Sequence, residues 1–280
     1  MRVTLLRHTL HSRWPFRYNF RMNDETIRAL VALNNEFYRA NHESFSSTRK
    51  GAWPGWARVC GHVECGQRPF HVIDVACGNL RFERYFRDCF PNADLCFDCL
   101  DSCPQLYRGV DGARFHEVDV MERLIEGKPL TPDAGMHDLA VSFGFMHHIP
   151  TQRLRNGFFN SLVECLKPGG IAAVSFWRFA TDERLHKRAV ATTRQGASDL
   201  GLALEANDYL VGWDGRPGTY RYCHSFTPLE IDEIIQSVWE SGTCIDRFDS
   251  DGRNGALNTY TVVRRLPDGQ RSSQLTRAKQ

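Results

Sequence analysis

Short hydrophobic runs alternate with amphipathic stretches along most of the chain. The hydrophobic runs, each typical of a buried strand, occupy residues 72–75, 93–100, 114–118, 139–143, 171–177 and 258–264. Apolar residues at helical spacing predict helices over residues 23–41, 81–90, 158–166 and 226–239. Strands separated by helix-length segments indicate βαβ units, and therefore an α/β fold with a mostly parallel sheet and helices on both faces.

The remaining segments differ from this alternation. Residues 180–221 have no clean strand pattern and are turn-rich at 212–218, so we expect an insertion over about 180–225 that caps a substrate. We expect the first helix to form a lid, and Thr227 to cap the helix that follows the insertion. The predicted organisation is a basic N-terminal arm (1–22), one main domain (23–266) and a polar, disordered tail (267–280).

Composition restricts the class of protein. The chain has 280 residues, of which 42% are hydrophobic and 24% charged, which suits one large α/β domain or two small ones. No stretch approaches the ~20 apolar residues that span a bilayer, so we expect a cytoplasmic protein without a membrane partner. The formal net charge of +2 is too near neutral to indicate nucleic-acid binding by itself.

The first residues are basic and lack acidic side chains before Asp24. Three interpretations stay open for this arm: a transit peptide, a solvated basic arm, or translated sequence ahead of a start at Met22. The basic residues are Arg2, Arg7, Arg13, Arg17 and Arg21.

Ten cysteines are scattered through predicted strands and helices. A disulfide framework belongs mainly to short secreted chains, so reduced thiols are expected. Cys96 and Cys99 have CxxC spacing, but no second pair follows at the distance usual for zinc. No metal site is therefore predicted.

Acidic side chains and a glycine turn mark the predicted carboxyl ends of the strands. The first strand ends in the segment VIDVACGNLRF (residues 72–82), where Gly78 lacks a Cβ and lets the backbone approach a ligand. Asp101, Asp119 and Phe143 fall at the ends of the second, third and fourth strands. In parallel sheets the ligand lies at this edge, near the point where the strand order reverses.

These strand ends, followed by KPGG at residues 167–170, resemble the class I S-adenosylmethionine-dependent methyltransferase superfamily. The first motif of that superfamily commonly reads DxGxGxG, and here Ala76 and Leu80 replace the first and third glycines. The resemblance implies a Rossmann-like fold with a seven-stranded sheet, and S-adenosyl-L-methionine as the cofactor. The side chain of Leu80 must then fit between helix and strand, or face the ligand.

The resemblance also assigns roles to these residues. We expect Asp74 to contact the amino group of the cofactor, Asp101 to accept from its ribose hydroxyls, and Asp119 to reach the adenine amino group. The predicted cofactor-binding residues are Asp74, Ala76, Gly78, Asn79, Arg81, Asp101, Asp119, Val120 and Phe143.

A narrower resemblance covers roughly residues 34–264. The segments at 38–56, 142–151, 208–213 and 221–226 (the last reading RYCHSF), together with Arg155, resemble the methyltransferases that esterify carboxymethyluridine at the tRNA wobble position. This resemblance implies tRNA as acceptor, with a small activating protein as a further partner. The predicted substrate-binding residues are Arg49, Trp53, Arg155, Arg221, Tyr222 and His224.

The chemistry of a carboxylate acceptor can be argued independently. A carboxylate with a pKa of about 4 is ionised at neutral pH and requires no general base. It requires a cation to hold it, and arginine is the best bidentate partner, so Arg49, Arg221 and Arg155 are the candidates. A hydroxyl acceptor would need a base, for which His147 or His148 could serve. The predicted catalytic residues are Arg49, Arg221 and His148.

Other interpretations stay open. Residues 143–146 read FGFM in place of the Asn/Asp-Pro-Pro-aromatic motif of adenine-type methylases, which disfavours a base-nitrogen acceptor. Trp53 and Trp56 suit core or lid packing better than base stacking. The rivals are a small-molecule methyltransferase and a non-catalytic binding module that keeps the fold.

Overall fold

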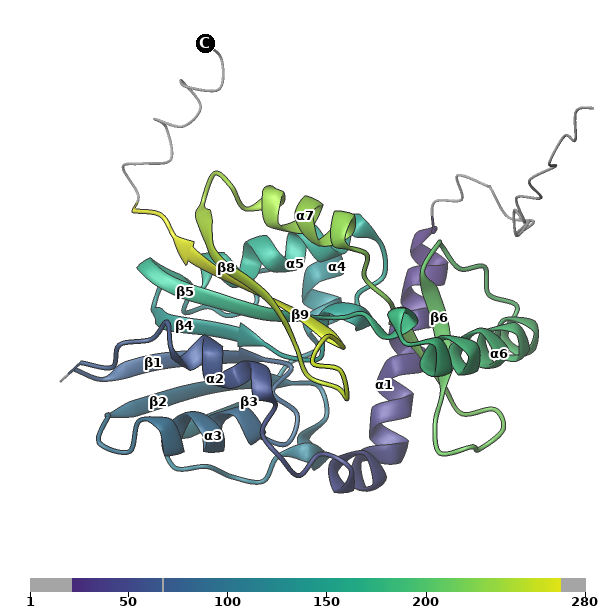
Figure 1. Cartoon of the computed structure of the whole chain (residues 1–280), viewed down its shortest axis with the longest axis horizontal. Helices are drawn as coiled ribbons and strands as arrows, with labels where there is room; N and C mark the ends of the chain where they lie inside the picture. The colour runs from purple at the N-terminus through teal and green to yellow at the C-terminus, as the bar shows by residue number, and fades with distance from the viewer. Residues whose placement is uncertain (1–21, 67, 268–280) are drawn as a thin grey trace, which may run out of the picture.

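The computed structural model describes residues 22–66 and 68–267. Seven strands form one sheet in the order β3-β2-β1-β4-β5-β9-β8 (Figure 1). The first five strands in that order are parallel, and β9 runs antiparallel to both β5 and β8. The strands are β1 (Phe70–Val75), β2 (Leu95–Asp101), β3 (Ala113–Glu117), β4 (His137–Ser142), β5 (Leu166–Trp177), β8 (Gly242–Ser250) and β9 (Asn258–Arg265).

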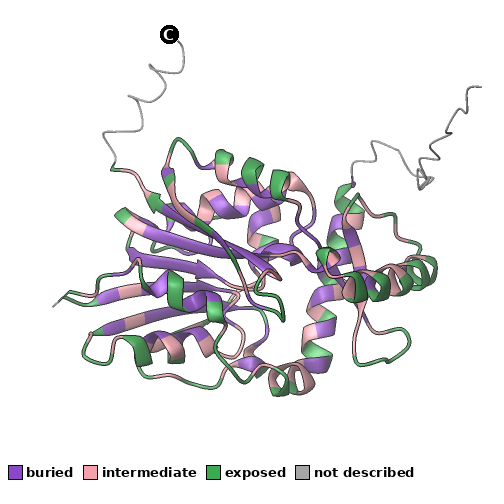
Figure 2. Cartoon of the chain, viewed as in Figure 1, coloured by how far each residue is buried: buried purple, intermediate pink, exposed green. Residues whose placement is uncertain are grey.

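Helices cover both faces of this sheet. One face packs on α2 (Pro54–Cys60) and α3 (Arg81–Cys89), the other on α4 (Val120–Ile125), α5 (Gln152–Glu164) and α7 (Pro228–Ser237). The alternation of strand side chains divides the core accordingly: Val72 packs with α2 and α3, whereas Ile73 and Val75 pack with the opposite cluster. Figure 2 shows the buried residues concentrated along these strands. The sequence-based prediction of an α/β, Rossmann-like sheet of seven strands is confirmed.

The chain forms a second structural unit after β5 and before α7. It consists of α6 (Glu183–Leu200) and a hairpin of β6 (Asp208–Gly212) and β7 (Tyr220–His224), which is separate from the large sheet. The pattern over residues 180–221 predicted no strand, so the hairpin is a correction. Short 3-10 turns occur at η1 (Pro104–Leu106), η2 (Met146–His148) and η3 (Phe179–Thr181).

Helix α1 (Asp24–Ser47) lies beside this second unit (Figure 1), and its Ile27, Leu30 and Val31 belong to the same core cluster as α4, α5 and α7. Asn23 caps its start, and it continues six residues past the predicted end at 41. Its Asn34 side chain accepts from the backbone N–H of Tyr222 and donates to the Tyr222 carbonyl, at 2.8 and 3.2 Å. Helix α1 is thereby joined to β7.

Helix ends follow the predicted local chemistry. Thr227 caps α7, and Glu230 completes a capping box with it. At the N-terminal boundary, Met22 is 7% exposed and belongs to the core, although the predicted arm included it. The rest of the predicted arm and nearly all of the predicted tail lie outside the described residues. Within the described ranges, no helix has the length and hydrophobicity needed to cross a membrane.

Candidate active site

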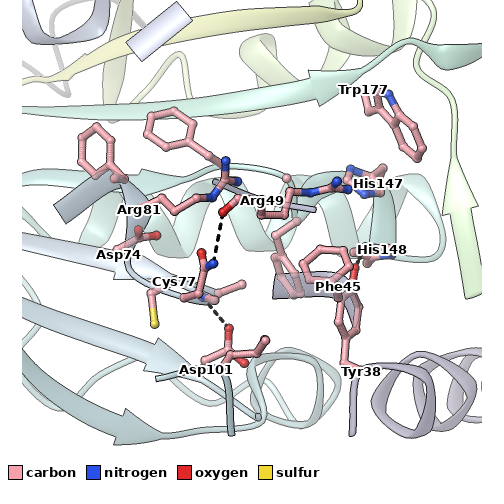
Figure 3. Close-up of a pocket in the computed structure, with 18 of the residues that line it drawn as sticks. Tyr38, Phe45, Arg49, Asp74, Cys77, Arg81, Asp101, His147, His148 and Trp177 are labelled. Carbon is pink, nitrogen blue, oxygen red and sulfur yellow. Dashed lines mark hydrogen bonds between the residues drawn. The ribbon is translucent and has the colours of Figure 1, made fainter. Parts of the chain in front are cut away.

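A cavity of about 550 Å³ opens at the carboxyl ends of β1, β2 and β4, and residues of α1 form one of its walls (Figure 3). Its volume lies within the range of roughly 300–1,000 Å³ typical of small-ligand pockets. All nine residues predicted to bind the cofactor line this cavity. So do Arg49, Trp53, His148 and Arg221 from the predicted catalytic and substrate-binding sets.

The turn after β1 adopts a left-handed backbone at three alternate positions. Ala76, Gly78 and Leu80 have φ angles of 64°, 57° and 57°. The turn thus keeps a glycine-like conformation where two of the motif's glycines are absent, at a cost of roughly 1–2 kcal/mol for each non-glycine residue. Leu80 is fully buried and packs in the core with Trp56 and Phe82, so its side chain fits between helix and sheet.

Gly78 leaves room for a ligand. A Cβ built at this position would meet no atom within 4 Å, because the cavity lies in front of it. Asp74, the penultimate residue of β1 and four positions before Gly78, lines the same cavity. An open glycine backbone beside a buried acid suits the amino-acid end of S-adenosylmethionine, so these residues fit that cofactor.

Asp101 braces the turn from the end of β2. Its two carboxyl oxygens accept hydrogen bonds from the backbone N–H groups of Gly78 (2.9 Å) and Cys103 (2.8 Å). Burial raises the pKa of Asp101, while these backbone donors favour its ionised form. The residue lines the cavity, and its predicted contact with the ribose stays a prediction.

Asp119 holds two elements together at the end of β3. One carboxyl oxygen accepts from the N–H of Glu122 at 3.0 Å and caps α4, and the other accepts from the Asn35 side chain of α1 at 2.7 Å. Its predicted approach to the adenine amino group stays a prediction. The carboxylate thus joins helix α1 to the carboxyl edge of the sheet.

Three guanidinium groups line the cavity without a carboxylate partner among the described residues, and one of them, that of Arg81, donates to the Gly51 carbonyl. Arg221, on β7, is 5% exposed. Arg49 follows α1, and its guanidinium lies 4.7 Å from the centre of the Phe45 ring. Burial and the positive charge of Arg221 lower the pKa of Arg49. Four aromatic rings surround Arg221 at 5.3–5.9 Å, those of Phe37, Phe45, Trp177 and Trp213.

His148 is fixed in one tautomer. Its Nδ1 lies 2.9 Å from the Tyr222 carbonyl, which can only accept, so Nδ1 carries the hydrogen. Nε2 therefore accepts from the Tyr38 hydroxyl at 2.7 Å. Burial and the charge of Arg221 lower the pKa of His148 to about 3, so the ring is neutral. Burial and the neighbouring cations also hold the pKa of His147 well below its usual value.

Three predicted substrate residues lie away from the cavity. Arg155, Tyr222 and His224 surround the buried carboxylate of Asp208, at 3.4, 2.7 and 2.7 Å from its Oδ1. Side chains alternate along β7, so Tyr222 and His224 point opposite to Arg221. The three residues brace the hairpin on which Arg221 stands.

Sequence reasoning missed Tyr38, which lines the cavity and contacts both His148 and Arg221. Its helical spacing from Asn34 was the available signal. His147, His148 and Cys223 also lie together, with potential metal-ligating atoms within 4.8 Å of one another. Both ring nitrogens of His148 already have partners, and two guanidinium groups lie nearby, so this cluster does not suit a cation.

Comparison with known proteins places this site in context. No family model matches the chain. A protein of Encephalitozoon cuniculi named only as a methyltransferase is 27% identical over 209 residues, which are 74% of this chain and 85% of that protein. Two proteins named tRNA (carboxymethyluridine(34)-5-O)-methyltransferase, from Arabidopsis thaliana and Xenopus tropicalis, are each 27% identical over 50% and 62% of this chain. The matches span only 31% and 28% of their lengths.

Solved structures agree on the fold. A methyltransferase of Burkholderia thailandensis, with bound 1,6-didemethyltoxoflavin and S-adenosylhomocysteine, has a TM-score of 0.58 and 16% identity, over 93% of this chain and 99% of its own. A S-adenosylmethionine-dependent methyltransferase structure from Methanosarcina mazei has a TM-score of 0.55 and 15% identity, over 78% of this chain and 100% of its own. The chain therefore has the fold of these structures.

Proposed function

We propose that this chain, an enzyme with the fold and sequence likeness of S-adenosylmethionine-dependent methyltransferases, methylates a carboxylate held between Arg49 and Arg221. The observation that carries the proposal is the pair of guanidinium groups on one cavity, neither with a carboxylate partner in the described ranges. An uncompensated buried cation costs several kcal/mol. An anionic acceptor would remove that cost and could be held by two parallel hydrogen bonds from one arginine.

The chemistry follows from the protonation states in the cavity. When bound, the cofactor supplies a methyl group on a positively charged sulfur. An acceptor carboxylate is ionised at neutral pH and needs no base, so the residues of the site mainly position it and exclude water. The buried, aromatic surroundings of Arg221 keep its charge poorly solvated, which strengthens its attraction for the acceptor.

Carboxymethyluridine in tRNA is the acceptor that we propose. Two relatives carry this activity in their names, and the segments at 38–56 and 221–226 resemble that family. A basic face would be needed to contact phosphates. Arg184, Lys187, Arg188 and Arg194 are exposed on α6, although Lys187 pairs with Glu183 at 2.6 Å. A small activating protein partner belongs to the same proposal.

The test uses the alkali lability of esters. The protein is incubated with methyl-labelled cofactor and either total tRNA or a metabolite pool, and the product is treated with mild alkali. Label that enters tRNA and is released as volatile methanol supports the proposal. Label in tRNA that survives alkali contradicts a carboxylate acceptor. Label that appears only in the metabolite pool contradicts tRNA as the acceptor.

A hydroxyl acceptor is the second candidate, because His147 could act as its base. Nδ1 of His147 is buried without a hydrogen-bond partner among the described residues, so it is free to accept a proton, although burial and the neighbouring charges lower the pKa of the ring and weaken it as a base. The product would be an alkali-stable ether, which the same treatment distinguishes. A non-catalytic module would be indicated if calorimetry detected no binding of S-adenosylhomocysteine.

A further inference from the structure

A second buried acid lies behind Asp74. Glu83, in the first turn of α3, is fully buried, and Asp74 is 4% exposed. Both acids lie beside Cys99, which pairs with Asp74 across β1 and β2 and whose Sγ is 3.4 Å from Oε1 of Glu83, so the two carboxyl groups share one buried site. Each acid has one buried carboxyl oxygen, Asp74 Oδ1 and Glu83 Oε2, that finds no hydrogen-bond donor among the described residues. The superfamily motif quoted above does not include this glutamate, and Glu83 does not line the cavity.

Two carboxylates cannot hydrogen-bond to each other unless one of them carries a proton. Burial raises the pKa of both groups, and the adjacent Glu83 raises that of Asp74 further, whereas the contact with Asp74 lowers that of Glu83. From β2, Asp101 adds a further negative charge, and the Cys99 thiol donates to Glu83 at 3.4 Å. The Cys77 thiol lies on the same side, and Arg84 on α3 is the positive charge that acts on the pair.

We propose that Asp74 and Glu83 share one proton in the free protein and release it when the ammonium group of the cofactor binds at Asp74. This inference rests on the proposed function only in taking that cofactor as the ligand. The free pair carries one negative charge, which limits repulsion in the empty site. With the ammonium in place the pair carries two negative charges, and both favour the bound cofactor. Glu83 is thus a positioning residue that acts through Asp74.

The linkage has a definite sign. Where the ambient pH lies below the pKa of the free pair and above that of the bound pair, one proton leaves per cofactor bound. Affinity then rises with pH by about tenfold per pH unit in that window. Above the window the proton is already absent from the free protein, and affinity becomes independent of pH.

Calorimetry with S-adenosylhomocysteine measures this proton. Titrations in two buffers of different ionisation enthalpy, repeated across the neutral range, give the number of protons released. We expect about one proton for the unaltered chain. In Glu83→Gln the amide donates permanently to Asp74, so binding should persist, release no proton and lose its rise with pH. Asp88→Asn, an exposed acid on the same helix, is the matched control and should release the proton normally.

The outcomes separate the two proposals. Binding to the unaltered chain without proton release, or unchanged release in Glu83→Gln, overturns this inference and leaves the methyltransferase proposal intact. No binding at any pH overturns both. If Glu83→Gln does not fold, infrared difference spectra of the unaltered chain decide, because S-adenosylhomocysteine should abolish the band of a protonated carboxyl group. Persistence of that band, or its absence from the free protein, contradicts the inference.

Discussion

The hydroxyl of Tyr38 lies 2.7 Å from Nε2 of His148 and 3.5 Å from a guanidinium nitrogen of Arg221. Helix α1, the turn after β4 and strand β7 thus meet at one phenol oxygen. Because the His148 ring is buried and neutral, Nε2 depends on this hydroxyl as its hydrogen donor.

Replacing Tyr38 with phenylalanine should leave Nε2 of His148 buried without a partner. We expect the free energy of unfolding to fall by about 1–3 kcal/mol, the usual cost of such a group. Urea denaturation followed by circular dichroism measures it. Tyr107→Phe is the control, because that half-buried tyrosine packs on Phe115 and should tolerate the change. Equal losses in both variants would mean that the hydroxyl of Tyr38 is not a structural donor.

Arg221→Gln should weaken binding of the acceptor without weakening binding of the cofactor. Loss of a charge-assisted hydrogen bond of about 1.5–3 kcal/mol corresponds to a fall in acceptor kcat/KM of roughly 10- to 100-fold. Binding of S-adenosylhomocysteine should stay within about twofold, because Arg221 lies away from the turn after β1. Arg28→Gln, on the exposed face of α1, is the control. A parallel loss of cofactor affinity would contradict separate subsites.

Asp101→Ala should lower the affinity for S-adenosylhomocysteine at least several-fold. The carboxylate holds the backbone N–H groups of Gly78 and Cys103, so its loss loosens the turn as well as removing the predicted ribose acceptor. Asp111→Ala, in the exposed loop before β3, should bind normally. Unchanged affinity in Asp101→Ala would show that the ribose acid has been misassigned.

The two non-glycine residues with a left-handed backbone in this turn should respond in opposite ways to replacement by glycine. Ala76→Gly relieves backbone strain and removes only a half-buried methyl group, so the stability should change by no more than about 1 kcal/mol, in the stabilising direction. Leu80→Gly relieves similar strain but empties a fully buried site, and should cost roughly 1–4 kcal/mol net. Thermal unfolding of both variants tests the pair, and a stabilised Leu80→Gly would contradict the packing role.

Acid should destabilise the protein through Glu230. Burial opposes its charge, yet the adjacent His224 ring and the hydroxyl and amide of Thr227 lower the pKa of Glu230 from 4.5 to about 2. A depressed folded-state pKa gives stability above 4.5 that is lost as the pH falls towards 2. Melting temperatures across this range should fall less steeply in Glu230→Gln than in the exposed control Glu233→Gln. Parallel curves for the two variants would rule out this contribution.

The strand ends were predictable from sequence because their chemistry is local. A continuous apolar run such as residues 139–143 indicates a buried strand by its composition alone. Asp101 and Asp119 stand at or just after the ends of β2 and β3 in the chain. The roles of those acids were harder to assign. The Asp119 carboxylate accepts a hydrogen bond from Asn35, which is 84 residues away in the chain, and no local sequence pattern predicts that partner.

The hairpin shows why other site residues were misplaced. RYCHSF was treated as one substrate-binding segment, although a strand turns its side chains alternately to opposite faces. Arg221 therefore lines the cavity, and Tyr222 and His224 meet Asp208 on the other side. An alternating pattern applied to residues 220–224 would have separated them. The partnership of Tyr38 with His148 and Arg221 depends on tertiary packing alone.

The pairing of Asn34 with Tyr222 has a further consequence. A two-stranded sheet exposes backbone donors and acceptors along both outer edges, and such edges recruit strands from other chains. At Tyr222 the Asn34 side chain takes both backbone groups, as a neighbouring strand would. The helix thus closes part of the β7 edge, and a foreign strand could add there only by displacing α1. Asn34, which joins α1 to the hairpin, therefore also blocks this part of the β7 edge from pairing with a strand of another chain.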